Sequence, residues 1–252
     1  DNVLRHSANG INLLGYDDDH PSQQTRRILI KNNLFNDIGY DNGSGTLYQL
    51  VDGTADVTIT HNTADQAGSI VVSSAGRPHS GFVFTDNIAL QNQYGVIGTN
   101  TGSGKPTLQT YFPDAVVSGN LFIGALPGLY PAGNYFPASL AAVGFVNLAD
   151  NQFDLSATSP YRNSSGGAAA GADFSALCHA LRDFGALRGA TVPSCNSTPP
   201  SAQAMAAATH CGDGVGSAPE KRGALLVALE IRRKHGPFCR LTGREAAYRA
   251  SG

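Results

Sequence analysis

The sequence predicts an all-β protein, a solenoid built from coils of three parallel strands. Three observations predict this class: asparagines recur at long intervals, an apolar-x-apolar triplet precedes most of them, and a glycine-led apolar strand follows. The asparagines are separated by 31, 29, 25 and 33 residues: Asn2, Asn33, Asn62, Asn87 and Asn120. An interval of about 20 to 50 residues is typical of stacked repeat architectures.

The strand before each of the last four asparagines alternates between apolar and other positions. The alternating pairs are Ile28/Ile30, Val57/Ile59, Phe82/Phe84 and Ala115/Val117. Alternation places the first and third side chains of a strand on one face. We therefore expect the intervening side chains to face outward: Leu29, Thr58, Val83 and Val116.

A short strand follows each asparagine, and a glycine then introduces a third strand. The glycine-led strands are residues 10–14, 45–50, 68–72 and 95–97. Three short strands per coil, without helical periodicity between them, favour three parallel sheets. An antiparallel barrel would show hairpin turns and no fixed period. Asparagines in register can hydrogen-bond along the stack, which explains their recurrence at a tight bend.

These units have the form Ile-x-Ile-x-x-Asn-x-Phe, as in residues 28–35. They resemble the right-handed parallel β-helix repeat proteins of the pectin-lyase-like superfamily over residues 1–125. Segments 144–163 and 171–173 also resemble the closing stretch of such proteins. The resemblance implies a right-handed parallel β-helix and a secreted or cell-surface protein that acts on polysaccharide. This superfamily holds lyases, hydrolases, epimerases and non-catalytic proteins, so the chemistry must be argued from the site.

The rest of the chain predicts an end to the solenoid and an extension beyond it. Residues 126–166 are rich in Pro, Gly and Asn, which indicates an irregular last coil. Apolar residues at helical spacing predict a helix over 172–187, which we expect to cover the open end of the solenoid. The predicted organisation is thus a β-helix with a C-terminal cap over residues 1–190. A linker and an Ala-rich, basic tail with one helix would occupy residues 191–252.

Composition limits the classes of partner. The net charge of −2 gives no reason to expect nucleic acid. No run approaches the roughly 18 apolar residues of a membrane span. No signal peptide is visible, so we expect a mature form, a fragment or a trimmed chain. We also expect the protein to be a monomer. The spacing of the cysteines does not match a zinc site and leaves three disulfide pairings open: Cys178, Cys195, Cys211 and Cys239.

In the proteins that this chain resembles, the glycine-led strand forms the floor of a groove. The outward floor positions expected here are Asn12, Leu14, Tyr48, Val71, Ser73, Ile97 and Thr99. This floor is neutral, unlike that of the polygalacturonase-like hydrolases, which place several aspartates there. None of their catalytic residues is carried over, and Asn12 and Tyr48 are predicted only to bind sugar.

The loops after these strands carry the charged residues, and they suggest a metal-assisted β-elimination. In order along the chain they are Asp17, Asp18, Asp19, His20, Asp52, Arg77, His79 and Lys105. Asp17 and Asp19 would hold Ca²⁺ against a uronate, and Arg77 or Lys105 would abstract the α-proton.

Glycoside hydrolysis is the second mechanism, because it needs two carboxylates, one as acid and one as base or nucleophile. Asp41 with Asp52 or Asp18 are the candidates. The opposite rim carries further polar residues: His6, Tyr40, Asp41 and Asp65. Of the residues on the two rims, Tyr40 and His79 are predicted to contact the substrate.

Structural roles compete for the same residues. Consecutive aspartates occur most often in solvated turns, and Tyr48 can equally be a packing residue. His6 and Asp37 each follow a bend asparagine by four residues, which favours a polar ladder for them. The competing function is a non-catalytic β-helix module that binds glycan or serves as a spacer.

Overall fold

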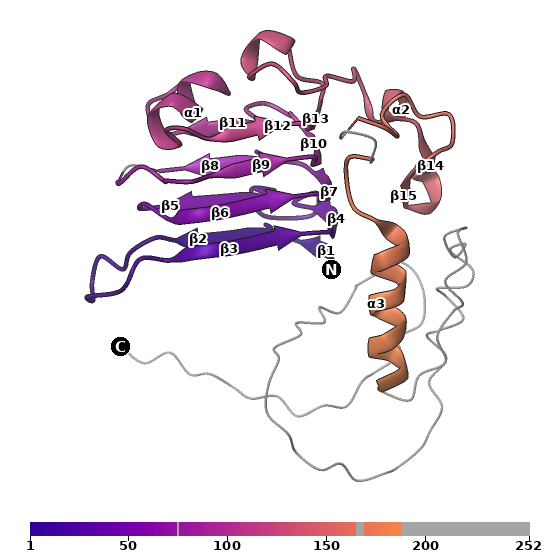
Figure 1. The fold of residues 1–252 in the computed structure, drawn as a ribbon, viewed down its shortest axis with the longest axis horizontal. Coiled ribbons are helices and arrows are strands. Elements are labelled where there is room, and N and C mark those ends of the chain that lie inside the picture. The colour runs from indigo at the N-terminus through magenta and orange to yellow at the C-terminus, as the bar shows by residue number, and fades with distance from the viewer. Residues whose placement is uncertain (75, 165–168, 188–252) are drawn as a thin grey trace. The chain divides into compact units, whose positions relative to one another are not determined.

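The computed structural model describes residues 1–74, 76–164 and 169–187 (Figure 1). The chain divides into two units, Asp1–Gly216 and Ser217–Gly252, and every described residue belongs to the first. The predicted linker and tail therefore lie outside the described residues. None of the helices in the described part combines the length and apolar character of a membrane span.

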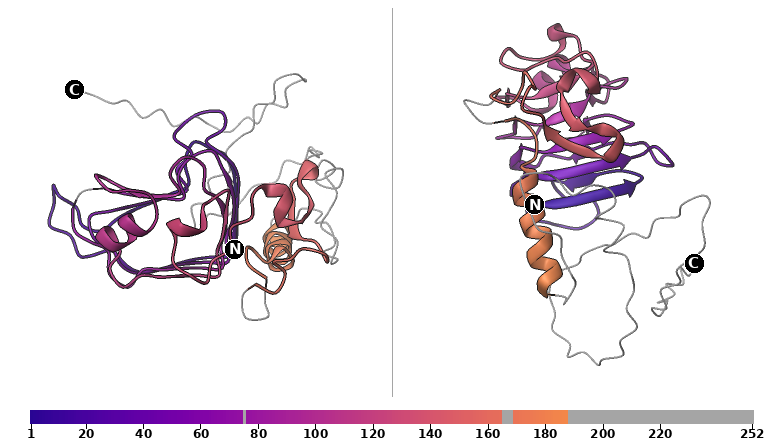
Figure 2. Two further views of the ribbon diagram at one scale, coloured as in Figure 1. Left: turned by 90° about the horizontal axis from the view of Figure 1, so that it is seen from above. Right: turned by 90° about the vertical axis from the view of Figure 1, so that its right-hand side faces the viewer.

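Within the described residues, thirteen strands form three parallel sheets (Figures 1 and 2). Each of the first four coils contributes one strand to each sheet, and the last coil contributes a strand to one sheet only. Sheet A contains β1 (Asn2–Ser7), β4 (Asn33–Ile38), β7 (Thr63–Gln66), β10 (Ile88–Leu90) and β13 (Leu121–Ile123). Sheet B contains β2 (Ile11–Leu14), β5 (Tyr48–Val51), β8 (Val71–Ser73) and β11 (Val96–Gly98). Sheet C contains β3 (Arg26–Lys31), β6 (Ala55–Thr60), β9 (Val83–Thr85) and β12 (Val116–Ser118). The predicted parallel β-solenoid is confirmed, with about four turns.

The alternation predicted before the asparagines is confirmed in sheet C. Val57 and Ile59 are buried in the core, and Phe84 stacks on them from the next coil with 1% of its surface exposed. The intervening Leu29 and Val116 are 64% and 51% exposed on the outer face. Because the strand has a period of two, this pattern alone orients the whole sheet.

Aromatic rings fill the core towards the last coil. The ring centroids of Phe84 and Phe122 lie 6.1 Å apart, and Tyr130 stacks on Phe122 at 3.8 Å. Phe136 stacks on both Phe122 and Tyr130. Tyr130 and Phe136 belong to the irregular segment after β13, so that segment covers the core of the last coil.

The predicted asparagine ladder is present, and it runs along the stack where the strands of sheet A begin. Asn33 Nδ2 donates to Asn62 Oδ1 at 2.8 Å, and Asn62 Nδ2 donates to Asn87 Oδ1 at 2.9 Å. The ladder continues through Asn120 to a sixth member, Asn134, which the sequence pattern missed because no triplet precedes it.

The residue before each ladder asparagine explains the bend. Asn32, His61 and Asp86 have φ of 56°, 52° and 57°, and Gly119 occupies the same place with φ of 71°. Asn, Asp, His and Gly are the residues that adopt the left-handed region most readily. His61 is therefore a structural residue of the bend.

The predicted C-terminal helix exists, but its place was predicted wrongly. It spans α3 (Phe174–Leu187), and Leu177 packs on Leu34 at the outer face of sheet A rather than across the end of the solenoid. The backbone N–H groups of Ala172 and Asp173 hold it there, donating to Thr63 Oγ1 at 2.9 Å and to Asn32 Oδ1 at 2.6 Å. Helical spacing identifies an apolar face but not the surface that the face covers.

Smaller elements precede α3. They are α1 (Lys105–Tyr111), η1 (Pro127–Leu129), α2 (Leu140–Val143), β14 (Phe145–Asn147), η2 (Leu148–Asp150) and β15 (Gln152–Leu155). β14 and β15 form an antiparallel pair, and Phe145 packs both on the apolar residues of sheet A and on Phe153. Cys178 of α3 is disulfide-bonded, and the other three cysteines lie outside the described residues.

Candidate functional site

The outer face of sheet B was predicted correctly in two coils and wrongly in the other two. Asn12, Leu14 and Thr99 are exposed and Ile97 is half-buried, as expected for outward positions. Strand pairing aligns Asn12 with Gln49, Val72 and Ile97 as one outward row. The outward row in the middle coils is therefore Gln49 and Val72.

Tyr48, Val71 and Ser73 instead face the core, so their expected outward placement is wrong. Tyr48 is 1% exposed, and its ring lies edge-on to Phe35 at 5.6 Å. The error is one residue in register, which exchanges the two faces of a strand. The pairing of β5 with β2 and of β8 with β5 and β11 fixes the register that was missed. Tyr48 is thus a packing residue and not available to a ligand.

The acidic first loop is held by hydrogen bonds within its own turn. The carboxylate of Asp17 accepts hydrogen bonds from the backbone N–H groups of Asp19 and His20, at 2.9 and 3.2 Å. Asp18 and Asp19 are exposed. Across the described ranges no group of three or more His, Cys, Asp or Glu side chains is arranged to hold a metal ion. The carboxylate of Asp17 therefore closes its own turn.

Asp52 and Arg77 are brought together in the structure, and they neutralise each other. Arg77 Nη1 lies 3.2 Å from Asp52 Oδ2, and the Arg77 backbone N–H donates to Asp52 Oδ1 at 3.3 Å. The guanidinium also lies over the ring of Tyr16, 4.4 Å from its centroid. Asp52 is only 7% exposed. The pair joins the loops of three successive coils, so Asp52 and Arg77 are held as structural links.

Lys105 and Asp41 remain exposed candidates without an observed partner. Lys105 is the first residue of α1, and Asp41 lies in the connection from β4 to β5. Neither forms an ion pair with another described residue. The structure therefore does not gather the predicted catalytic residues around one point.

His79 is buried between coils and cannot reach a substrate. Its Nδ1 accepts from the backbone N–H of Thr54 at 2.9 Å, and its ring stacks on Phe112 at 4.8 Å. Its Nε2 lies 3.1 Å from Ser73 Oγ. Because Nδ1 is an acceptor, Nε2 carries the proton, so it cannot act as a base towards the Ser73 hydroxyl. Ser73 and His79 are thus a buried structural pair.

Burial of the His79 ring lowers its pKa from 6.5 to about 4. The unfolded chain then binds more protons than the folded chain between these two pH values, so stability is full above pH 6.5 and falls as pH decreases towards 4. Between pH 7 and pH 4 we expect this residue to lower the free energy of unfolding by about 3 kcal/mol. Urea unfolding at a series of pH values over this range measures the decrease. His79→Gln should flatten this slope.

NMR titration of the His79 imidazole provides a second measurement that does not depend on a variant. A midpoint near 6.5 in the folded protein would contradict the expectation.

A polar cluster that the sequence analysis only partly identified lies at the ends of β1, β4 and β7. We name it the acid rim: His6, Asp37, Tyr40 and Asp65. Tyr40 Oη donates to Asp65 Oδ1 at 2.7 Å, and His6 Nδ1 contacts Asp37 Oδ2. All four side chains are at least partly exposed. The sequence predicted Tyr40 as a substrate-binding residue. It assigned Asp37 to a structural polar ladder, and Asp65 was named only as a polar residue on the rim opposite the charged loops.

The two carboxyl groups of the acid rim have different surroundings. Burial raises the pKa of Asp65, and the charge of Asp37 raises it further, against the hydrogen bond from Tyr40. The pKa of the Tyr40 hydroxyl is also raised, first by burial and then by Asp65. Asp37 has φ of 60°, and its carboxylate contacts the imidazole of His6.

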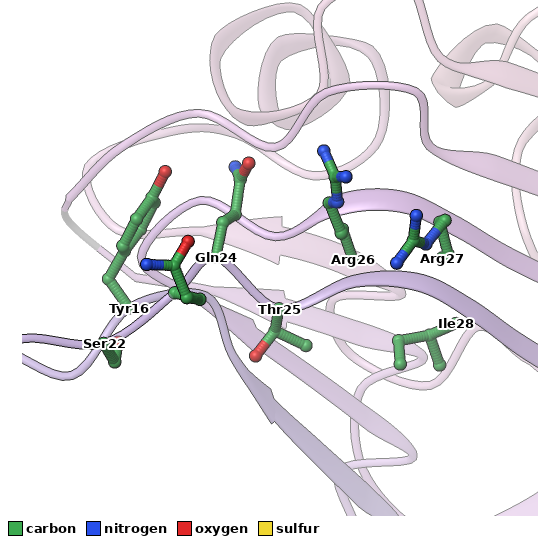
Figure 3. A pocket seen from close by; sticks show the side chains of 8 residues that line it. Tyr16, Ser22, Gln24, Thr25, Arg26, Arg27 and Ile28 are labelled. Atoms are coloured by element: carbon green, nitrogen blue, oxygen red, sulfur yellow. The ribbon is translucent and has the colours of Figure 1, made fainter.

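A pocket of about 690 Å³ lies at the opposite corner of the first coil, between the loop after β2 and the strand β3 (Figure 3). We name it the arginine pocket. It is lined by Tyr16, Ser22, Gln23, Gln24, Thr25, Arg26, Arg27 and Ile28. The side chains of Tyr16, Gln24, Arg26 and Arg27 project to one side in Figure 3.

Comparison with known proteins assigns no family. No family model matches the chain, and neither a curated protein nor a solved structure matches it.

Proposed function

We propose that this solenoid is a glycoside hydrolase of the pectin-lyase-like superfamily that cleaves an extended polysaccharide at the acid rim. One observation carries the proposal. Asp37 and Asp65 stand on neighbouring strands of sheet A, and burial together with the charge of Asp37 raises the pKa of Asp65. A carboxyl group whose surroundings raise its pKa, with a second carboxyl group beside it, is suited to act as the acid of the pair.

Asp65 is the acid in this proposal. Its raised pKa keeps the proton on the carboxyl group to a higher pH. Tyr40 donates to Oδ1 of Asp65, which leaves Oδ2 to carry the proton towards the glycosidic oxygen. Tyr40 thus positions the acid, and its exposed ring is still available for the substrate contact predicted for it.

Asp37 is the nucleophile. Its strand β4 pairs with β7, which carries Asp65, and the charge of Asp37 acts on Asp65, so the two carboxyl groups are neighbours, as the acid and the nucleophile of a retaining glycosidase must be. Asp65 transfers its proton to the leaving oxygen while the Asp37 carboxylate bonds to the anomeric carbon and the glycosidic C–O bond breaks. Water then hydrolyses the ester, giving its proton to Asp65, and Asp37 leaves as the carboxylate.

The outer face of sheet B supports a path for the polysaccharide beside the acid rim. Tyr40 and Tyr94 are 53% and 46% exposed in the connections from sheet A to sheet B, where a sugar ring can stack. Asn12 and Gln49 are exposed amides on the face itself. The disulfide at Cys178 supports a secreted or cell-surface location, where disulfides persist. We propose action as a monomer.

The second candidate is a glycan-binding module without catalysis. The outer rows of sheet B, including Val72, Ile97 and Thr99, carry no charged side chain, which suits binding of a neutral chain. In that case the acid rim would serve only to join the first three coils.

A panel of uronate-containing and neutral polysaccharides separates these functions. We expect new reducing ends without ultraviolet absorbance from an unsaturated product, because hydrolysis adds water across the bond. Ultraviolet absorbance would instead indicate β-elimination and overturn the hydrolase. Retention on an immobilised polysaccharide without new reducing ends would favour the binding module.

A further inference from the structure

The arginine pocket has no part in the proposed hydrolysis, and its two arginines need another explanation. Neither Arg26 nor Arg27 forms an ion pair or a side-chain hydrogen bond within the described residues, although both are exposed. Each guanidinium offers five N–H donors in a fixed plane. Unpaired donors that converge on a pocket are suited to an anion with several oxygens.

Backbone conformation places the side chains of the two arginines on one side of the strand. Consecutive residues of a strand normally point to opposite faces. Arg27 has φ of 59°, which interrupts the alternation, and Figure 3 shows the side chains of Arg26 and Arg27 on the same side while Thr25 and Ile28 point away. Ile28 packs against the core, so the strand continues normally after the interruption.

Arg27 is also unusual among the coils. The same left-handed position is occupied by Asp56, Gly81 and Asp114 in the following coils, with φ of 51°, 61° and 61°. Asp and Gly tolerate this region, whereas a long side chain gains no local hydrogen bond there. The first coil therefore keeps a strained arginine where its neighbours have residues suited to the bend, and such strain is concentrated at binding and catalytic sites.

The remaining lining adds polar groups and fixes the walls. Gln24 Nε2 donates to the carbonyl of Gly53 at 2.8 Å, which holds that side chain against the second coil. Tyr16 lies under the Arg77 guanidinium, whose charge Asp52 already balances. The nearest acid in register is Asp56, aligned with Arg27, and it is not within ion-pair distance.

We propose that the arginine pocket binds an oxyanion substituent of a glycan, a sulfate ester or a uronate carboxylate, through Arg26 and Arg27. The site is separate from the acid rim, and its occupation does not depend on hydrolysis. Both candidate groups present coplanar pairs of oxygens to a guanidinium.

Isothermal titration calorimetry of the whole chain tests this with three oligosaccharides of equal length: sulfated, uronate-containing and neutral. We expect at least one anionic oligosaccharide to bind about 10-fold or more tighter than the neutral one. The double variant Arg26→Gln/Arg27→Gln should remove that preference. Because it removes two positive charges, the slope of log Kd against the logarithm of the salt concentration should decrease by about two.

The control is Lys31→Gln, which removes an exposed cation of β3 outside the pocket. It should leave the preference intact. Equal loss of affinity in the Lys31 variant would mean non-specific attraction and would overturn the proposal, as would equal affinity for all three oligosaccharides. The oligosaccharide that is preferred identifies the substituent as sulfate or carboxylate.

Discussion

Replacing Asp65 with Asn is expected to lower kcat on the cleaved polysaccharide by roughly 10²–10⁴-fold. Asn has nearly the same shape and still accepts the hydrogen bond from Tyr40, but it cannot give a proton to the glycosidic oxygen. The loss should therefore appear in kcat more than in KM, because binding of the sugar does not need the proton. Initial rates of reducing-end release measure both constants.

The pH profile of the proposed hydrolysis gives a second signature. That reaction requires protonated Asp65, so the rate should fall as pH rises through the pKa of this group, which burial has raised. The basic limb should vanish in Asp65→Asn. Asp114→Asn is the matched control, since Asp114 is exposed in the last coil and Asn also tolerates its left-handed backbone. A normal rate in the Asp65 variant would refute its role as the acid.

Replacing Asn87 with Ala is expected to destabilise the solenoid by about 3–5 kcal/mol. Asn87 Oδ1 accepts from both the backbone N–H and the Nδ2 group of Asn62, and Asn87 Nδ2 donates to Asn120 Oδ1. The substitution leaves these buried groups unpaired in the middle of the stack, where water cannot replace the lost partner. The free energy of unfolding in urea measures the cost.

Asn2→Ala is the matched control for the ladder. Asn2 is exposed at the end of the stack and donates one ladder hydrogen bond, to Asn33 Oδ1 at 2.8 Å. Its removal should cost about 0.5–1.5 kcal/mol. Similar costs for the two variants would mean that the ladder does not depend on burial.

Features that depend on local pattern could be predicted from the sequence. The apolar triplet Ile28–Ile30 and the asparagine at residue 33 recur in every coil, and each recurrence fixes a strand face and a bend. Stacking then follows, because parallel strands can satisfy their backbone groups only with the coils above and below. The helix at 174–187 was likewise visible from its spacing.

The candidate site depended on features that do not appear in the local pattern. Asp37 and Asp65 differ by 28 positions in the sequence and become neighbours only because β4 and β7 pair. Arg77 and Asp52 look like a base and an acid in the sequence, and only their 3.2 Å contact shows that they neutralise each other. Charge type can be read from a sequence, whereas pKa and availability depend on the surrounding groups.

The sequence by itself determined the architecture: a parallel solenoid with an asparagine ladder, since alternation and period are properties of short segments. Only the tertiary structure decided which face Tyr48 takes, where α3 packs and which carboxyl group of the acid rim has a raised pKa. Strand pairing sets the first, and the apolar outer face of sheet A sets the second. The third follows from the burial of Asp65 and from stacking, which brings the charge of Asp37 close to it.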